Sequence, residues 1–268
     1  RQNFSDSISI YISVSLLISI VWLHYREYFI EEHIFMNESD MFNGDIKINY
    51  YGALCTMMYE ELHRDTPQDE LEFYLSYAKK EANILEALCG SGRFFIPFLK
   101  RGLNIKGIDN SHEMLEKLKL KSPNADTFEV DIEQYQSSEK FDYIFISSGS
   151  VSLFTDIRQC KKILKKINLL LKTNGKFVFA VDTVASRCKN DNDYNIKVSL
   201  KLKHDYTLIL KSKNWYDEKT HTQFSPSIYE LYDGKKLLQS DFMNFQIHLY
   251  ELGEMDNLLQ ETGFTKFC

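Results

Sequence analysis

The chain has 268 residues, of which 44% are hydrophobic and 26% are charged, and this composition predicts a folded protein with one sizeable core. Lys and Arg number 32 against 38 Asp and Glu, so the net charge of −6 provides no overall positive field for nucleic acid. The five cysteines form no Cys-x-x-Cys pair, which predicts reduced thiols in a cytoplasmic protein and no metal site.

The N-terminal part contains an uncharged stretch, residues 7–23, that is long enough to be considered as a membrane span. It has no basic cluster before it and no small-residue cleavage site after it, so it does not resemble a signal peptide. Met36 opens a polar run typical of an ordinary N-terminus. We expect residues 1–35 to be an extension that is not native; the competing interpretation is a membrane anchor, and a membrane partner is expected only if residues 7–23 are native.

The middle of the chain alternates between helical and strand-like patterns. Helices are predicted at residues 50–63, 68–80, 94–99, 110–121 and 157–172, the fourth with a capping box formed by Asn110 and Glu113 and the last stopped by Asn174-Gly175. Strands are predicted at residues 83–88, 104–108, 127–130, 141–147 and 176–181. This alternation predicts a doubly wound α/β fold with a mostly parallel sheet and helices on both faces.

Polar residues follow four of these strands: the loop Gly90-Ser91-Gly92, then Asp109, Asp131 and the loop 147–150. Ligands of such sheets bind beyond the carboxyl ends of the strands. The glycine loop opens a helix, and glycines together with free helical N–H groups suit a nucleotide-like ligand. We therefore place the binding site at this edge of the sheet.

The pattern changes after residue 194. Residues 195–250 show alternating stretches and turn signals without a helix, which predicts an antiparallel platform of three or four strands inserted after the fifth strand. A helix at 251–262 and the start of a last strand after Gly263-Phe264 follow. The predicted organisation is an extension (1–35), a binding domain (36–194), the platform on the acceptor or dimer side (195–250) and a final helix with a strand that stops short (251–268).

The glycine loop discriminates between cofactors. A dinucleotide site calls for Gly-x-Gly-x-x-Gly, and the third glycine is replaced here by Phe95. The segment Glu86-x-x-x-Gly90-Ser91-Gly92 instead resembles the first motif of the Rossmann-like (class I) S-adenosylmethionine-dependent methyltransferases. Residues 106–115, 130–132 and 169–175 resemble further motifs of that family, whose sheet is of a seven-stranded type, and the resemblance covers about residues 50–264.

The resemblance implies roles for individual residues. Asp109 lies at the interval from the loop at which an acidic side chain accepts both ribose hydroxyl protons. The glycine loop would pass under the methionine and ribose, Arg93 would lie near the methionine carboxylate, and Asp131 with its neighbour would read the adenine edge. The expected S-adenosylmethionine-binding residues are Tyr51, Glu86, Gly90, Ser91, Gly92, Arg93, Asp109, Asn110, Met114, Asp131, Ile132 and Ser147.

The acceptor is less well defined. Transfer from a sulfonium needs mainly alignment and exclusion of water, so no catalytic base is assigned. Platform candidates are His204, His221, His248, Tyr216 and Tyr232, each of which we expect to be structural. The order of elements resembles small-molecule methyltransferases, although the arginine expected near residues 246–248 is missing. We expect a monomer or homodimer that methylates nitrogen or oxygen of a small molecule.

Three alternatives remain open. The chain can be an RNA or protein methyltransferase. Nucleic-acid methylation is weakened because loop 147–150 reads Ser-Ser-Gly-Ser rather than Asn-Pro-Pro-Tyr, although the lysines of residues 161–172 and 197–213 offer a basic surface. The chain can also be a catalytically silent protein that binds S-adenosylmethionine, or a dinucleotide-binding oxidoreductase, which Phe95 disfavours.

Overall fold

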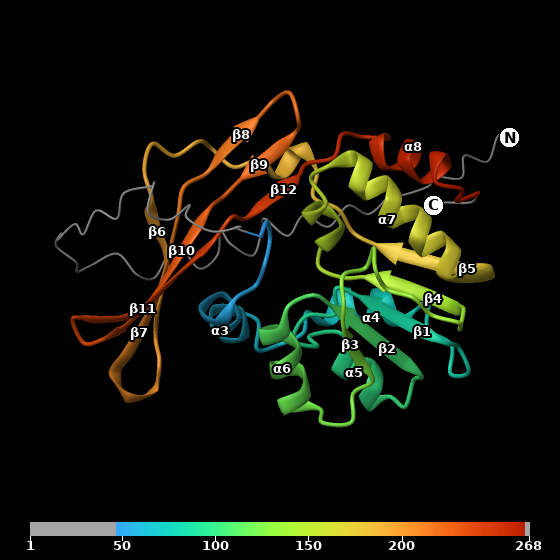
Figure 1. Ribbon diagram of the computed structural model, residues 1–268, viewed down its shortest axis with the longest axis horizontal. Helices are drawn as coiled ribbons and strands as arrows, with labels where there is room; N and C mark the ends of the chain where they lie inside the picture. The colour runs from blue at the N-terminus through green and yellow to red at the C-terminus, as the bar shows by residue number, and fades with distance from the viewer. Residues whose placement is uncertain (1–46, 266–268) are drawn as a thin grey trace, which may run out of the picture.

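The computed structural model describes residues 47–265, and its centre is a five-stranded parallel sheet (Figure 1). The strand order is β3-β2-β1-β4-β5, so β1 and β4 are neighbours at the reversal of strand order where doubly wound sheets bind ligands. This confirms the predicted α/β fold; of the seven-stranded type of sheet that the resemblance implies, the described residues form five strands. The strands are β1 (Ile84–Ala87), β2 (Ile105–Asp109), β3 (Thr127–Glu129), β4 (Phe141–Ile146) and β5 (Leu171–Phe179).

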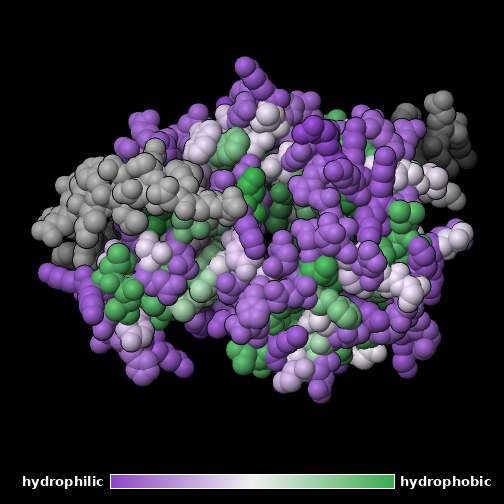
Figure 2. All heavy atoms as spheres, in the orientation of Figure 1, coloured by the Kyte–Doolittle hydropathy of each residue, from purple (hydrophilic) through white to green (hydrophobic). Residues whose placement is uncertain are grey.

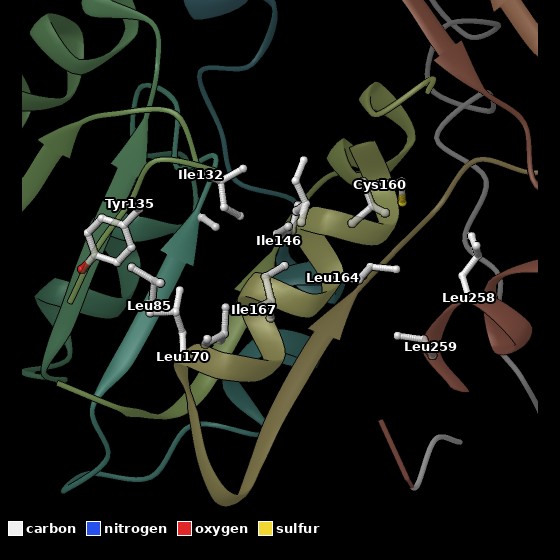
Figure 3. Close-up of a cluster of buried hydrophobic side chains, with 14 of the residues drawn as sticks. Leu85, Ile132, Tyr135, Ile146, Cys160, Leu164, Ile167, Leu170, Leu258 and Leu259 are labelled. Atoms are coloured by element: carbon white, nitrogen blue, oxygen red, sulfur yellow. The ribbon is translucent and has the colours of Figure 1, made fainter. Parts of the chain in front are cut away.

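Helices cover both faces of this sheet and create two separate cores. Successive β1 residues point to opposite faces: Ile84 packs in the cluster with α4, α5 and α6, whereas Leu85 packs in the cluster with α7 and α8 (Figure 3). Every residue of β1 is buried, as expected for a central parallel strand. The helices are α4 (Gln68–Leu75), α5 (Phe95–Lys100), α6 (His112–Lys121), α7 (Ile157–Leu170) and α8 (Glu254–Glu261), with 3₁₀ turns η2 (Ser150–Leu153) and η3 (Val184–Ser186).

The insertion after β5 is larger than predicted. It contains seven strands in two antiparallel sheets, with orders β11-β10-β7-β6 and β12-β9-β8. The prediction of three or four strands was wrong because the second sheet consists of three-residue strands, too short to show an alternating pattern. The strands are β6 (Asn195–Lys201), β7 (Tyr206–Ser212), β8 (Trp215–Asp217), β9 (Thr222–Phe224), β10 (Ser227–Asp233), β11 (Lys236–Met243) and β12 (Gln246–His248), and η4 (Lys203–Asp205) precedes β7.

Helix α3 (Ala53–Leu62) lies between the parallel sheet and the larger insertion sheet (Figure 1). Its apolar side, including Leu54 and Met58, forms a third core with Leu208 and Tyr229 of that sheet. Asn49, just before α3, has a left-handed φ of 54° and donates to the carbonyls of Leu153 and Gln246. The segment before the first strand therefore fastens the insertion to the parallel sheet.

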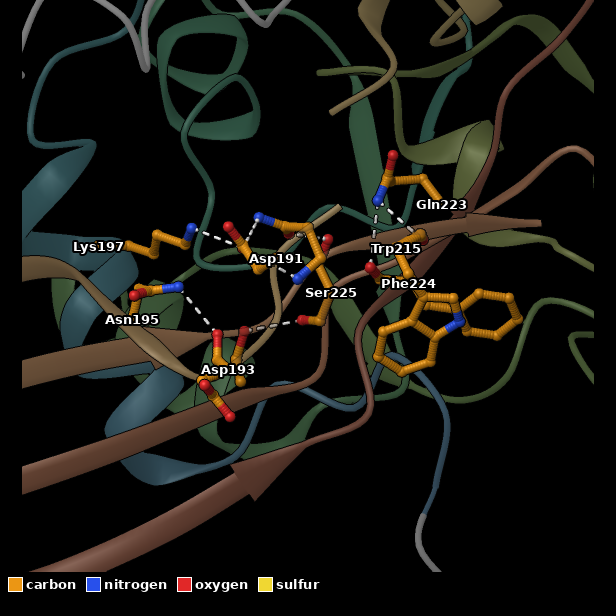
Figure 4. Close-up of polar contacts among 10 residues, drawn as sticks. Asp191, Asp193, Asn195, Lys197, Trp215, Gln223, Phe224 and Ser225 are labelled. Atoms are coloured by element: carbon orange, nitrogen blue, oxygen red, sulfur yellow. Dashed lines mark hydrogen bonds and ion pairs between the residues drawn. The ribbon is translucent and has the colours of Figure 1, made fainter. Parts of the chain in front are cut away.

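Polar contacts fix the loops of the insertion (Figure 4). The Asp191 carboxylate accepts from Lys197 Nζ at 2.8 Å and from the side-chain amide of Asn214 at 2.8 Å. On the smaller sheet, Gln223 Nε2 donates to the Trp215 carbonyl at 2.9 Å, and the rings of Trp215 and Phe224 stack with centroids 5.1 Å apart. These contacts give the short strands their support.

Several predicted boundaries differ from the structure. The capping box of Asn110 and Glu113 was wrong: Ser111 caps α6 by accepting from Met114 N, and Glu113 accepts instead from the Tyr50 hydroxyl. Helix α7 ends at Leu170 because β5 begins immediately, and Asn174-Gly175 forms an irregularity at the start of that strand. Shorter helices than predicted are found at α3, α4 and α8.

The predicted extension (1–35), its apolar stretch 7–23 and the last strand at 266–268 lie outside the described residues. Within residues 47–265, no helix is both long and apolar enough to cross a bilayer. Figure 2 shows a face on which hydrophilic side chains predominate over the parallel-sheet half, with apolar side chains in small separate patches.

Candidate functional site

The loop after β1 has an unusual backbone that its glycines permit. Gly90 and Gly92 have φ values of 51° and 87°, and Leu88 also has a positive φ of 57°, a strained conformation for a branched residue. A Cβ on Gly92 would lie 2.9 Å from Leu118 Cγ, so this glycine is required for packing against α6. A Cβ on Gly90 would meet only Met114 Sδ, at 4.0 Å, which leaves that side of the loop open to a ligand.

Phe95, which replaces the third glycine of a dinucleotide motif, is fully buried. The space for its ring comes from Gly107 on β2, where an added Cβ would lie 3.0 Å from Phe95 Cε2 and 2.8 Å from Cys89 Sγ. The close approach of helix and strand is thus achieved with the small residue on the strand instead of the helix. The sequence interpretation did not find this relation, although the glycine inside an apolar strand is its visible signal.

Asp109 joins the end of β2 to the glycine loop. Its Oδ2 accepts from Gly90 N at 2.8 Å and its Oδ1 from Ser111 N at 2.9 Å. Burial raises the pKa of Asp109, and the same backbone N–H groups oppose that rise. Ser111 in turn donates from Oγ to the Tyr51 carbonyl at 2.7 Å, so the segment before α3 is attached to this corner.

Glu86, on β1, is a buried acid, with 1% of its surface exposed. Its Oε1 accepts from Ser147 Oγ at 3.0 Å, whereas its Oε2 has no hydrogen-bond partner among the described residues. Burial raises the pKa of Glu86 well above its ordinary value, and the charges of Asp109 and Glu70 add to the rise. A buried carboxyl oxygen without a donor is costly, so this atom is suited to receive a donor from a ligand.

The loop after β4 lies beside Glu86 and borders two further carboxyls that were not predicted. Glu70 of α4 accepts from Ser148 N at 2.9 Å, and Ser148 and Gly149 both have left-handed φ values, 56° and 69°. A Cβ on Gly149 would lie 3.1 Å from Asp182 Oδ2. The sequence could have predicted Asp182, because it follows an apolar strand as Asp109 does. It could not have predicted Glu70, because acids in the first turn of a helix are common.

Arg93 and Ser91 sit at the start of α5 with different surroundings. The Arg93 guanidinium interacts with the Tyr59 hydroxyl, and its Nε donates to the Asp65 carbonyl at 3.4 Å. Tyr51 packs edge-on against Tyr59, with ring centroids 6.2 Å apart. Ser91 is buried, and its Oγ has no partner among the described residues. The side chains of Tyr51 and Arg93 therefore meet at Tyr59.

The predicted adenine side is assembled from α6 and the turn after β3. Met114 is buried next to Gly90, and Asn110 is exposed. Asp131 Oδ1 accepts from Glu133 N at 2.8 Å, a contact within its own turn. The Ile132 side chain packs in the core near Tyr135 (Figure 3), which leaves its backbone as the group available to a ligand.

The five acceptor candidates of the platform have structural contacts. His248 is buried, with Nε2 2.7 Å from Glu254 Oε1 and Nδ1 3.1 Å from the Thr220 carbonyl. His221 lies 3.8 Å from Glu251, and Tyr216 lies under the Arg187 guanidinium at 4.4 Å. The remaining two contribute to the insertion itself: Tyr232 donates to Glu230, and His204 has a left-handed φ in η4. No group of three residues suited to bind a metal exists within 47–265.

Comparison with known proteins shows which families this arrangement resembles. Residues 84–175 match the family described as methyltransferase domain. A malonyl-[acyl-carrier protein] O-methyltransferase of Ilyobacter polytropus is 36% identical over 117 residues, which cover 42% of each chain, and a second such enzyme of that organism is 30% identical over 138 residues. The chain spans about half the length of the curated relatives it matches.

Solved structures extend the likeness to the whole fold. A sugar N-methyltransferase of Streptoalloteichus is 13% identical with a TM-score of 0.65, over 89% of this chain and 91% of the other. An S-adenosylmethionine-bound amino pentose methyltransferase of Micromonospora gives 14% identity and a TM-score of 0.60, over 81% and 91%. Together with the strand order, these findings show that residues 84–175 match a methyltransferase domain and that the chain has the fold of the class I S-adenosylmethionine-dependent methyltransferases.

Proposed function

We propose that this chain transfers the methyl group of S-adenosylmethionine to a nitrogen or oxygen atom of a small molecule. The observation that carries the proposal is the convergence of Glu86, Gly90 and Asp109 at the carboxyl ends of β1 and β2, with Asp109 bonded to the Gly90 amide. Nitrogen and oxygen are both retained as the atom that receives the methyl group. Two curated relatives are named O-methyltransferases, and the solved sugar enzyme is named an N-methyltransferase.

The residues present fit this donor molecule. Oε2 of Glu86 lacks a donor and suits the ammonium of the methionine part, whose positive charge would favour ionised Glu86 over the protonated form that burial favours in the free protein. Asp109, with oxygen lone pairs beyond its two backbone contacts, suits the ribose hydroxyls, and Asn110 follows it on the same corner. The open side of Gly90 next to Met114 suits the flat adenine.

We assign the remaining contacts in the same way. Asp131 and the Ile132 amide would read the adenine edge, Ser91 and Gly92 would line the loop, and Tyr51 and Arg93 would close the methionine end. Ser147 acts through its bond to Glu86. When bound, the sulfonium supplies an activated methyl group; the protein holds the two reactants in line and excludes water.

Calorimetry tests the proposal with S-adenosylmethionine and NAD as probes. We expect the first to bind and the second not to bind. Asp109→Asn is expected to lower the affinity for S-adenosylmethionine at least about tenfold, because it removes one charge-assisted hydrogen bond of about 1.5 kcal/mol. The control is Glu129→Gln, because Glu129 is an exposed acid at the register position beside Asp109. Binding of NAD alone, or unchanged affinity in the Asp109 variant, would contradict the assignment.

A further inference from the structure

Asp182 is not among the residues that we assign to the binding of S-adenosylmethionine. It follows β5, the neighbour of β4, and its carboxylate lies against the bare backbone of Gly149. Both backbone groups of Asp182 are fixed: its N–H donates to Ser152 Oγ at 2.7 Å and its carbonyl accepts from Tyr250 N at 2.9 Å. The backbone of Asp182 is therefore held in place at the carboxyl end of the sheet, and its carboxylate lies beside the loop after β4.

Three carboxyls contact three successive residues of this loop. Glu86 accepts from Ser147, Glu70 accepts from Ser148, and Asp182 lies over Gly149. The left-handed φ of Gly149, 69°, and the nearness of Oδ2 leave no room for a side chain there. Ligands of doubly wound sheets bind at this edge, and the loop there is bordered by carboxyl groups from three separate parts of the chain.

Burial alone raises the pKa of Asp182 to about 6. At Glu70, burial also raises the pKa, and the Arg93 charge partly opposes that rise. Arg187, further along the chain, pairs with Glu218 at 2.5 Å. The Cys188 thiol, whose pKa is raised mainly by burial, is also affected by the Asp182 charge. Once ionised, the half-buried Asp182 carboxylate attracts a cation and repels a carboxylate acceptor.

We propose that the methyl acceptor carries a basic amino group and that Asp182 binds this group and accepts its proton. This inference rests on the proposed methyl transfer. An ammonium has no lone pair, so one N–H proton first passes to the Asp182 carboxylate. The freed nitrogen pair then forms the bond to the methyl carbon while the carbon–sulfur bond breaks, leaving its electrons on a neutral thioether. The methylated nitrogen carries the positive charge, and Asp182 returns its proton to solvent.

The acidity of Asp182 suits this role at neutral pH. With a pKa of about 6, most molecules hold the carboxylate ionised at pH 7, and the group is a stronger base than an exposed aspartate. The rate should therefore fall as the pH drops through about 6, since the protonated acid neither attracts the ammonium nor takes its proton.

The experiment uses the full chain and three pools of small molecules on shared scaffolds: amino sugars with aliphatic amines, the matching alcohols, and the matching carboxylates. Transfer of a trideuterated methyl from labelled S-adenosylmethionine is followed by mass spectrometry. Binding of each pool in the presence of S-adenosylhomocysteine is followed by calorimetry. We expect binding and labelling in the amine pool alone.

Asp182→Asn is expected to lower kcat/KM for the labelled amine at least about 100-fold and to remove the fall in rate below pH 6, with unchanged affinity for S-adenosylmethionine. Asp182→Glu is expected to recover part of the rate. Asp193→Asn, at an exposed acid of the following loop, serves as the control and should behave as the original chain.

Three results would overturn this inference. They are labelling of the alcohols or carboxylates, an Asp182→Asn variant with an unaltered rate, and a chain that binds S-adenosylmethionine but neither binds nor methylates any amine. Failure of the original chain to bind S-adenosylmethionine overturns the proposed function instead, so the two failures are distinguished.

Discussion

Replacing Gly107 by alanine tests the packing that accommodates Phe95. The added Cβ would lie 2.8 Å from Cys89 Sγ and 3.0 Å from Phe95 Cε2, both closer than ordinary contacts. Overpacking of this kind costs about 1–3 kcal/mol, whereas the lower entropy of an unfolded chain with alanine returns about 0.4–1 kcal/mol. We expect Gly107→Ala to lower the free energy of unfolding by about 1–2 kcal/mol, measured by urea denaturation with far-UV circular dichroism.

A double-mutant cycle with Phe95→Leu isolates the contact. Leucine removes ring atoms that approach position 107, whereas the contact with Cys89 Sγ at 2.8 Å remains. The alanine should therefore still destabilise that background, but by about 0.5 kcal/mol less than in the original chain. Gly52→Ala is the control, because a Cβ there meets nothing within 4 Å. An equal cost of Gly107→Ala in both backgrounds would refute the reasoning, since the clash would then not involve Phe95.

Two further predictions concern stability. Ser111→Ala removes the cap of α6 and the donor to the Tyr51 carbonyl, so we expect the free energy of unfolding, measured by thermal denaturation, to fall by about 1–2 kcal/mol. The control Ser138→Ala, at an exposed serine, should leave it unchanged. A Ser111 variant as stable as the original chain would contradict this. Glu86→Gln should alter the pH dependence of stability. Because the folded pKa of Glu86 is raised well above 4.5, the folded state keeps a proton that the unfolded chain loses, and stability falls as the pH rises above about 4.5. Glu86→Gln has no carboxyl group to titrate, so its free energy of unfolding should not show this fall. The difference between the variant and the original chain should therefore shift in favour of the variant between pH 4.5 and 7 in urea titrations. A difference that stays constant with pH would show that Glu86 is not buried as an acid.

The sequence was informative where chemistry and local geometry coincide. The glycine loop, Asp109 and the buried β1 strand are encoded within a few residues, and the structure places them together. Contacts set by tertiary packing were not predictable in this way. Glu70 reaches Ser148 across 78 residues, and Gly107 is explained only by the ring of Phe95. The smaller insertion sheet was missed because its strands contain too few residues to alternate.

The acids around the loop after β4 also have a consequence for folding. Ser148 contacts a residue 78 positions away, Ser147 one 61 positions away, and Ser152 one 30 positions away, and each partner belongs to a different element. Contacts of such sequence separation form late, because the chain between their ends must first be ordered. The loop consequently takes its shape only once α4, β1 and the end of β5 have docked. Methylation competence would then report the completion of folding, and no fragment lacking one of these elements would possess it.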